Sequence, residues 1–287
     1  MNLSLLIDKV RLALLKRSGK AQGANGRTYE GWKSKGYIKE PLISFIIQSH
    51  EKSLQVCHIL GALRSVPESE IIVIDDGSSI EHTERLAREL TGTNEFLVRA
   101  NDLYENVMYD KCLRFANGRY VALLQDDDDI QDGEWARRAV ELFRQYPDMA
   151  ILGGCDGRKV HFFVDEKGRK CYRSEEMSRK DFCFVMSVNR APMWINHDLY
   201  KQHLRHIDYS FAPFQSDDYE LCLRAWTLGL KVGWYRLHLP SLSVGGMRIY
   251  NNSFTREMTE RNMPLLYDLY ADKEESILDR VEQANKR

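Results

Sequence analysis

The chain has 287 residues, a hydrophobic fraction of 43% and a formal net charge of −1. This length and apolar content suit one large or two small globular domains and argue against disorder. The balanced charge lacks the basic surplus of a nucleic-acid-binding protein, so we expect no nucleic-acid partner. The six cysteines form no CxxC pair and match no zinc spacing. We interpret them as scattered thiols in a reducing compartment, which predicts a cytoplasmic protein.

Residues 1–40 are predicted to form an amphipathic helix followed by a linker. No apolar stretch approaches the roughly 20 residues needed to span a bilayer. The helix could lie on an anionic membrane surface as a peripheral contact, or pack on its own domain or a partner subunit. The apolar stripe consists of Leu3, Leu6, Val10 and Leu14, and the added positive charge comes from Lys9, Arg11, Lys16 and Arg17.

After Pro41, short apolar segments rich in β-formers alternate with longer segments of helical periodicity. This alternation predicts an α/β fold with a largely parallel sheet and right-handed connections. Strands are expected over Ile43–Gln48, Glu70–Asp75, Glu95–Arg99, Tyr120–Leu124 and Ala150–Gly153, and helices over Leu54–Leu63, Glu81–Leu90, Tyr104–Ala116 and Trp135–Tyr146.

The pattern becomes mixed after residue 153. We place the main domain at residues 41–245, with halves at 41–153 and 154–245, and a helical tail at 246–287. The expected elements are a β-hairpin of Val160–Val164 with Lys170–Arg173, strands over Phe182–Val188 and Lys231–Tyr235, and helices over His197–Leu204, Asp217–Leu228 and Met263–Val281.

Four consecutive aspartates, Asp126 to Asp129, follow the strand predicted over Tyr120–Leu124. Adjacent carboxylates repel one another unless a positive group lies among them. Hard cations such as Mg²⁺ and Mn²⁺ prefer oxygen ligands and often share them with substrate phosphates. Ligands of open α/β sheets bind beyond the carboxyl ends of the strands, which favours a metal site over a solvated acidic turn.

Two further acidic blocks accompany this tetrad. Asp75 and Asp76 end a predicted strand before Gly77, where they could accept hydrogen bonds from a base or ribose, or simply form a strand-to-helix turn. Asp217, Asp218 and Glu220 begin a predicted helix. They could complement the helix dipole, or one of them could be a general base whose pKa is raised by crowding.

These blocks, in this order, resemble family 2 glycosyltransferases with the GT-A fold. The likeness covers roughly residues 41–240. The matching stretches are Pro41–Lys52, Ile71–Ser79, Ala116–Ile130 and Ser216–Gly229.

The resemblance implies an inverting transferase that uses a nucleotide-diphosphate sugar, with residues 41–153 as the nucleotide-binding half and 154–245 as the acceptor half. UDP is the most frequent nucleotide in the family, while GDP and dTDP stay open. The acceptor would be a saccharide or a lipid-linked oligosaccharide, and the cofactor Mn²⁺ or Mg²⁺. The implied nucleotide-binding residues are Gln48, His50, Asp75, Asp76, Asp126 and Asp127, and the implied metal ligands are Asp128 and Asp126, with the register uncertain by one.

The acceptor side is implied by the acidic pair at the start of the helix predicted over Asp217–Leu228. Asp218 would be the general base and Asp217 an acceptor-binding residue. Trp194 could stack on a sugar ring or belong to the core. Many family members carry a histidine before a Gly-Gly pair, which is missing before Gly245. His238 is a weak substitute, because a lone histidine is more often a packing or surface residue.

Two other functions were weighed. A sugar nucleotidyltransferase shares an α/β sheet and carboxylate-bound Mg²⁺, but normally has a glycine-rich loop after the first strand, and residues 48–51 contain no glycine. A non-catalytic carbohydrate-binding homologue would be expected to have lost acidic residues that are intact here in all three blocks.

Overall fold

The computed structural model describes residues 7, 10, 14, 30, 31, 33–190, 192–237, 239, 242 and 252–286. The chain divides into two units, Met1–Lys39 with Gly92–Asn94, and Glu40–Thr91 with Glu95–Arg287. In the first unit, Ile7, Val10 and Leu14 are helical and their side chains are exposed. Val10 and Leu14 belong to the predicted apolar stripe, and its other members, Leu3 and Leu6, lie outside the described residues. Within the described ranges, no helix combines the length and apolar character required to cross a membrane.

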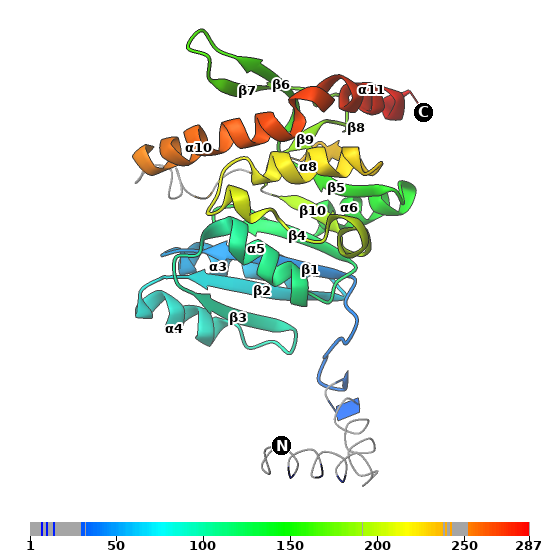
Figure 1. The fold of residues 1–287 in the computed structure, drawn as a ribbon. Helices are drawn as coiled ribbons and strands as arrows, with labels where there is room; N and C mark the ends of the chain where they lie inside the picture. Colours follow the sequence, from blue (N-terminus) through cyan, green and yellow to red (C-terminus); the bar gives the residue numbers. More distant parts are fainter. Residues whose placement is uncertain are drawn as a thin grey trace. The chain divides into compact units, whose positions relative to one another are not determined.

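The second unit is built on an eight-stranded sheet (Figure 1). Its strands are β1 (Ile43–Ser49), β2 (Ser69–Asp76), β3 (Glu95–Ala100), β4 (Tyr120–Gln125), β5 (Met149–Gly153), β8 (Phe182–Phe184), β10 (Met193–Asn196) and β11 (Lys231–Tyr235). The spatial order is β3-β2-β1-β4-β10-β5-β11-β8. Strands β3, β2, β1 and β4 pair in parallel, as do β5 and β11, whereas β10 and β8 run antiparallel to their neighbours. The predicted mostly parallel α/β fold is therefore confirmed.

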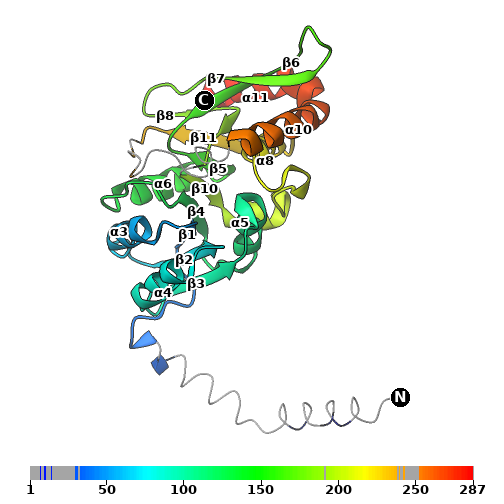
Figure 2. The ribbon, with the colours of Figure 1, turned by 90° about the vertical axis from the view of Figure 1, so that its left-hand side faces the viewer.

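Helices cover both faces of this sheet. They are α3 (Ser53–Leu63), α4 (Ile80–Glu89), α5 (Tyr104–Phe115), α6 (Glu134–Gln145) and α8 (Asp217–Thr227). In the turned view, α3, α4 and α6 lie on one side of the strands, and α5 and α8 lie on the other (Figure 2). The central strands are consequently buried on both faces, which explains why β4 is a continuous apolar run up to Leu124 and why consecutive apolar residues, Phe45 to Ile47, fill the centre of β1.

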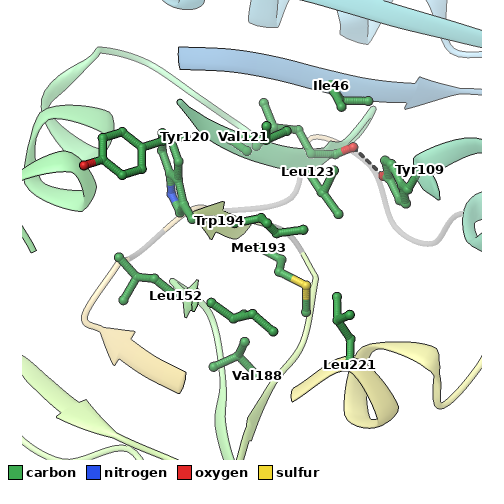
Figure 3. Packing of buried hydrophobic residues seen from close by; sticks show 14 of the residues in the cluster. Ile46, Tyr109, Tyr120, Val121, Leu123, Leu152, Val188, Met193, Trp194 and Leu221 are labelled. Carbon is green, nitrogen blue, oxygen red and sulfur yellow. Dashed lines mark hydrogen bonds between the residues drawn. The ribbon is translucent and has the colours of Figure 1, made fainter. Parts of the chain in front are cut away.

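The core is centred where β4 meets β10 (Figure 3). Leu123 pairs with Met193 and Val121 with Ile195 across these strands, and all four side chains are fully buried. On the side of α5, the Tyr109 hydroxyl donates a hydrogen bond of 2.7 Å to the carbonyl oxygen of Leu124. This contact joins α5 to the end of β4, immediately before the aspartate tetrad.

A second sheet, in the order β7-β6-β9, is formed by β6 (Gly157–Val164), β7 (Lys170–Glu176) and β9 (Ser187–Val188). The predicted hairpin is present as β6 and β7, which pair antiparallel. The C-terminal helices are α10 (Asn252–Tyr270) and α11 (Glu274–Asn285), separated by the 3-10 turn Ala271–Lys273, and α10 packs against β7.

Three sequence predictions differ from the observed elements. The single helix expected over Met263–Val281 is divided into α10 and α11 by the 3-10 turn. The single strand expected over Phe182–Val188 is divided into β8 and β9, which belong to different sheets. Strand β10 was not predicted, because four residues are too few to show a periodicity. The helix expected over His197–Leu204 is present as a short helix, α7 (His197–Leu199), continued by a π-helical turn over Tyr200–Leu204.

Candidate active site

The carboxyl ends of β1, β2 and β4 meet at one edge of the main sheet. Gln48 pairs in register with Ile74 on β2 and with Gln125 on β4. The residues that follow each strand therefore emerge beside one another, although they are far apart in the sequence. This register explains why the acidic blocks after β2 and β4 lie at the same edge.

Asp76 is a buried carboxylate that organises the loop before α5. Its oxygens accept hydrogen bonds from the backbone N–H groups of Leu103, at 2.9 Å, and Tyr104, at 2.7 Å. The Gln48 side-chain amide donates a third, at 3.1 Å. Tyr104 has a φ of 62°, in the left-handed region. Asp76 thus holds a strained turn in place, in addition to the nucleotide contact implied for it.

Asp75 is fully buried, and its two oxygens have different surroundings. Oδ2 accepts a hydrogen bond from the Thr83 hydroxyl, whereas Oδ1 is buried without a hydrogen-bond partner in the described part of the chain. Gly77 follows with a φ of 82°, and a Cβ there would lie 2.7 Å from a carboxylate oxygen of Asp102. Glycine is required at this turn for its backbone conformation and for the close approach.

Asp126 and Asp127, the first half of the tetrad, flank a lysine from the loop after β1. The Lys52 ammonium lies 3.5 Å from Asp126 and 4.0 Å from Asp127. Asp126 also accepts a hydrogen bond from the backbone N–H of His50. Burial raises the pKa of Asp126 to about 6, against the opposing effect of Lys52. Negative charge is therefore concentrated at this turn even with the lysine present.

Asp128 and Asp129, the second half of the tetrad, point to different partners. Asp128 is buried and accepts a hydrogen bond from the backbone N–H of Gln125 at 3.0 Å. Burial, with repulsion from the neighbouring aspartates, raises its pKa to about 7. Asp129 instead faces His58 of α3, at 3.2 Å. The four aspartates are thus not equivalent, and Asp129 is directed away from the other three.

The donor atoms of this turn fit a hard divalent cation. Asp126, Asp127 and Asp128 offer only carboxylate oxygens, and burial raises the pKa of two of them, so an added positive charge would be stabilised. Among the described residues, no three metal-ligating side chains form a preassembled cluster. A cation held by one or two of these carboxylates and completed by substrate phosphates is a common arrangement for Mg²⁺.

The third acidic block lies at the start of α8 and contains one buried and one partly exposed aspartate. Asp217 is 1% exposed and pairs with the guanidinium of Arg190. Asn106 of α5 donates a further hydrogen bond to Asp217, at 3.2 Å. Asp218 is half-buried, and its carboxylate accepts a hydrogen bond from the backbone N–H of Tyr219. Only Asp218 of this pair reaches the surface, so the expected contact of Asp217 with an acceptor is not supported by its position.

A chain of polar contacts connects the tetrad with α8. The Gln125 amide donates to Glu105 of α5 at 3.3 Å, and Glu105 accepts from Arg190 at 2.9 Å. Arg190 then pairs with Asp217. Glu105, Arg190 and Lys52 were not singled out from the sequence. Their partners lie 20 to 85 residues away, and no local motif marks such pairs.

Trp194 requires a correction. The sequence left it open between an acceptor platform and a core residue, and the family resemblance favoured the acceptor side. The structure places it in β10 with 0% exposure, packed against Phe45 and Trp135 (Figure 3). A side chain enclosed on all sides cannot stack on a sugar, so Trp194 is a core residue. His238, the weak metal candidate, lies outside the described residues.

A mostly parallel sheet with acidic turns at one edge is the architecture of GT-A glycosyltransferases, and structural comparison agrees. S. aureus TarS residues 1–349 match with a TM-score of 0.53 and 14% identity over 84% of this chain and 70% of that one. The mannosyltransferase PcManGT from Pyrobaculum calidifontis, solved with GDP-Man and Mn²⁺, matches with a TM-score of 0.54 and 12% identity over 94% and 84%. GalNAc-T7, solved with UDP, GalNAc and Mn²⁺, matches with a TM-score of 0.53 and 14% identity over 69% of this chain and 43% of that one.

The sequence itself identifies the family. The family described as Glycosyl transferase family 2 matches residues 44–217, which is more than half of the chain. The chain therefore belongs to glycosyltransferase family 2 and is a glycosyltransferase with the GT-A fold. No curated protein sequence matches it significantly.

Proposed function

We propose that this protein is an inverting glycosyltransferase that moves a sugar from a nucleotide-diphosphate donor, with UDP as the first nucleotide to test, to a hydroxyl of a saccharide or lipid-linked acceptor. The observation that carries the proposal is the arrangement of three acidic groups around one sheet edge. Asp75 and Asp76 end β2, the tetrad follows β4, and Asp218 begins α8, which is tied to the tetrad through Glu105 and Arg190.

In this proposal the nucleoside lies at the ends of β1 and β2. Gln48 is buried, and among the described residues its Oε1 has no hydrogen-bond partner. The same holds for Oδ1 of Asp75. Buried acceptors without partners are costly, so a donor group from a ligand would stabilise them. The imide or amino group of a nucleobase, or a ribose hydroxyl, supplies such donors. His50 borders the same edge through its Nδ1 contact of 2.7 Å with the Asp76 carbonyl oxygen.

The transfer step assigns the base role to Asp218. The acceptor hydroxyl oxygen attacks the anomeric carbon as the bond from that carbon to the diphosphate oxygen breaks. The hydroxyl proton passes to the Asp218 carboxylate, and the nucleoside diphosphate departs with the bonding electron pair. A single displacement of this kind inverts the configuration of the anomeric carbon. A divalent cation, Mg²⁺ or Mn²⁺, bound by Asp128 and Asp126 would neutralise charge on the departing diphosphate.

Several further roles stay proposals. Residues 41–153 would form the nucleotide-binding half, residues 154–245 the acceptor half and residues 246–287 a helical tail. The N-terminal stripe would provide a peripheral membrane contact, which suits a lipid-linked acceptor at the inner face of a membrane. The exposed helical residues Ile7, Val10 and Leu14 are compatible with that contact.

A donor panel tests the proposal most directly. Thermal shift is measured with UDP-, GDP- and dTDP-sugars in the presence of Mn²⁺, because a ligand that binds the folded state raises its apparent stability. Calorimetry then compares binding of the best nucleotide with Mn²⁺ and with EDTA, in the wild type and in Asp128→Ala. We expect binding to weaken in EDTA and in the variant, and equal affinity throughout would exclude the metal role.

The alternative functions give different results in the same assays. A sugar nucleotidyltransferase would consume a sugar phosphate and a nucleoside triphosphate and release pyrophosphate. A non-catalytic homologue would bind a donor or saccharide without releasing nucleoside diphosphate. Release of UDP or GDP from the donor, with no pyrophosphate, therefore separates the proposed transferase from both.

A further inference from the structure

Arg190 is a buried cation at the centre of the polar chain that connects the tetrad with α8. Its side chain is 7% exposed and is held between Glu105 of α5 and Asp217 of α8. The guanidinium also lies over the ring of Tyr109, 5.2 Å from the ring centroid. Burial by itself lowers the pKa of Arg190, but Asp217 and Glu105 outweigh burial and raise it, so the guanidinium stays charged.

Burying these charged side chains costs desolvation free energy. Two charged groups removed from water are often no more stabilising than apolar residues of the same volume. The Nε of Arg190 is also buried without a hydrogen-bond partner among the described residues. Packing alone therefore does not explain why a charged group lies at this position. Arg190 lies between the turn after β4 and the start of α8, which suggests a role in the reaction.

Arg190 is also electrostatically coupled to Asp218. Against the effect of burial, Asp217, Glu105 and Asp218 each raise the pKa of the guanidinium. The guanidinium therefore interacts with the charge of Asp218 in addition to its direct pair with Asp217.

We propose that Arg190 is a positioning residue for the transfer reaction. It fixes the first turn of α8, and with it Asp218, through its pair with Asp217, and it connects this turn to the end of β4 through Glu105 and Gln125. The inference rests on the proposed function, because it takes Asp218 as the general base. Arg190 acts through Asp217 and makes no contact with the reacting atoms itself.

The simplest alternative is that Arg190 only neutralises the buried charge of Asp217. A pair of variants separates the two roles. In Arg190→Met the Asp217 charge loses its partner, so unfolding is expected. In the double variant Arg190→Met with Asp217→Asn, both charges are removed and the shapes are nearly kept. The single variant Asp217→Asn is the matched control, because it keeps the guanidinium and removes the same carboxylate.

The experiment uses the full chain with Mn²⁺ and measures three quantities. UDP affinity is measured by calorimetry, and the melting temperature by thermal unfolding. Turnover is measured as nucleoside diphosphate release from UDP-glucose, UDP-N-acetylglucosamine and GDP-mannose with water as the acceptor, over pH 5 to 9. Release by the wild type tests the proposed function, whereas the ratio of each variant to the wild type tests the role of Arg190.

We expect the double variant to fold and to bind UDP within about threefold of the wild type, while turnover falls at least 100-fold, in the range typical of lost acid–base catalysis. Arg190→Lys, which keeps a cation beside Asp217, should recover part of the turnover. Asp217→Asn should lose less turnover than the double variant, because its amide oxygen can still accept a hydrogen bond from the guanidinium. A folded double variant with wild-type turnover would overturn the inference.

Discussion

The carboxylate of Asp126 accepts a hydrogen bond from the backbone N–H of His50, with 3.1 Å between nitrogen and oxygen. This bond joins the turn after β4 directly to the end of β1. The His50 ring in turn contacts the Asp76 carbonyl oxygen at the end of β2. Three strand ends are therefore fastened together by two residues, so a change at Asp126 should affect nucleotide binding and local order in separable ways.

Asp126→Asn is predicted to weaken metal-dependent nucleotide binding. The amide oxygen can still accept the hydrogen bond from His50, so the turn should keep its shape, while the charge that attracts a cation is lost. We expect UDP affinity in Mn²⁺ to fall at least tenfold, which corresponds to about 1.4 kcal/mol. Affinity in EDTA should change little. Calorimetry in Mn²⁺ and in EDTA measures the UDP affinity of the wild type and of the variant.

Asp129→Asn is the matched control for this variant. It makes the same chemical change three residues away, but the Asp129 carboxylate faces His58 and not the other aspartates. UDP affinity in Mn²⁺ should stay close to that of the wild type. If Asp129→Asn weakens binding as much as Asp126→Asn, the ligands have been assigned to the wrong half of the tetrad.

Asp218→Asn is predicted to separate donor binding from transfer. The amide cannot accept a proton from the acceptor, so turnover should fall by about 10²–10⁴-fold. Donor affinity should be retained, because Asp218 lies on α8 and not at the ends of β1, β2 or β4. Turnover is measured as nucleoside diphosphate release and donor affinity by calorimetry, on the same preparation. Transfer that survives the change would place the base at another residue.

Trp194→Phe is predicted to change stability without changing substrate affinity. The smaller ring leaves a cavity against Phe45 and Trp135, and it loses the indole N–H bond of 3.2 Å to the Tyr235 hydroxyl. We expect a loss of about 2 kcal/mol in the free energy of unfolding. Urea unfolding measures the loss. A raised KM for a saccharide acceptor, with unchanged stability, would show that Trp194 contacts the acceptor sugar despite its burial.

The fold of residues 41–153 could be predicted from the sequence because its signals are local. Each strand there contains at least three consecutive apolar residues, each helix has its own period, and Gly77 and the tetrad follow directly at strand ends. Strand β10 carries no such signal. Its four residues insert antiparallel between β4 and β5, and that pairing depends on the rest of the sheet being present.

The contacts of the candidate site also could not be predicted from local sequence patterns. The acidic blocks are recognisable in the sequence as clusters of like charge, but the residues that pair with them are not. Lys52 precedes Asp126 by 74 positions, and Glu105 is 85 residues from Arg190, so only the folded chain shows which carboxylates are paired. The role of Trp194 could not be decided from the sequence, because an aromatic residue has the same appearance there whether it faces the core or a ligand.

Asp110 gives a prediction about stability and pH away from the acidic turns. This carboxylate of α5 is completely buried, and it accepts hydrogen bonds from the hydroxyls of Tyr200 and Tyr209 and from the backbone N–H of Ile207. Burial raises its pKa, but these bonds, with Arg114, outweigh burial and lower the pKa below 3.8. Asp110 thereby fastens α5 to the segment that leads into α8.

Asp110→Asn should therefore destabilise the protein by about 2–4 kcal/mol at pH 7, because its amide group turns a donor toward buried donors. The folded pKa is lower than the unfolded one, so the stabilisation by Asp110 is present above about pH 4 and is lost as the pH falls through the folded value. The difference between wild type and variant in urea unfolding should consequently shrink toward pH 3. Asp198→Asn, which alters an exposed pair with Arg119 at 3.7 Å, should cost less than about 1 kcal/mol. A constant difference between pH 7 and pH 3 would show that folding does not change the pKa of Asp110.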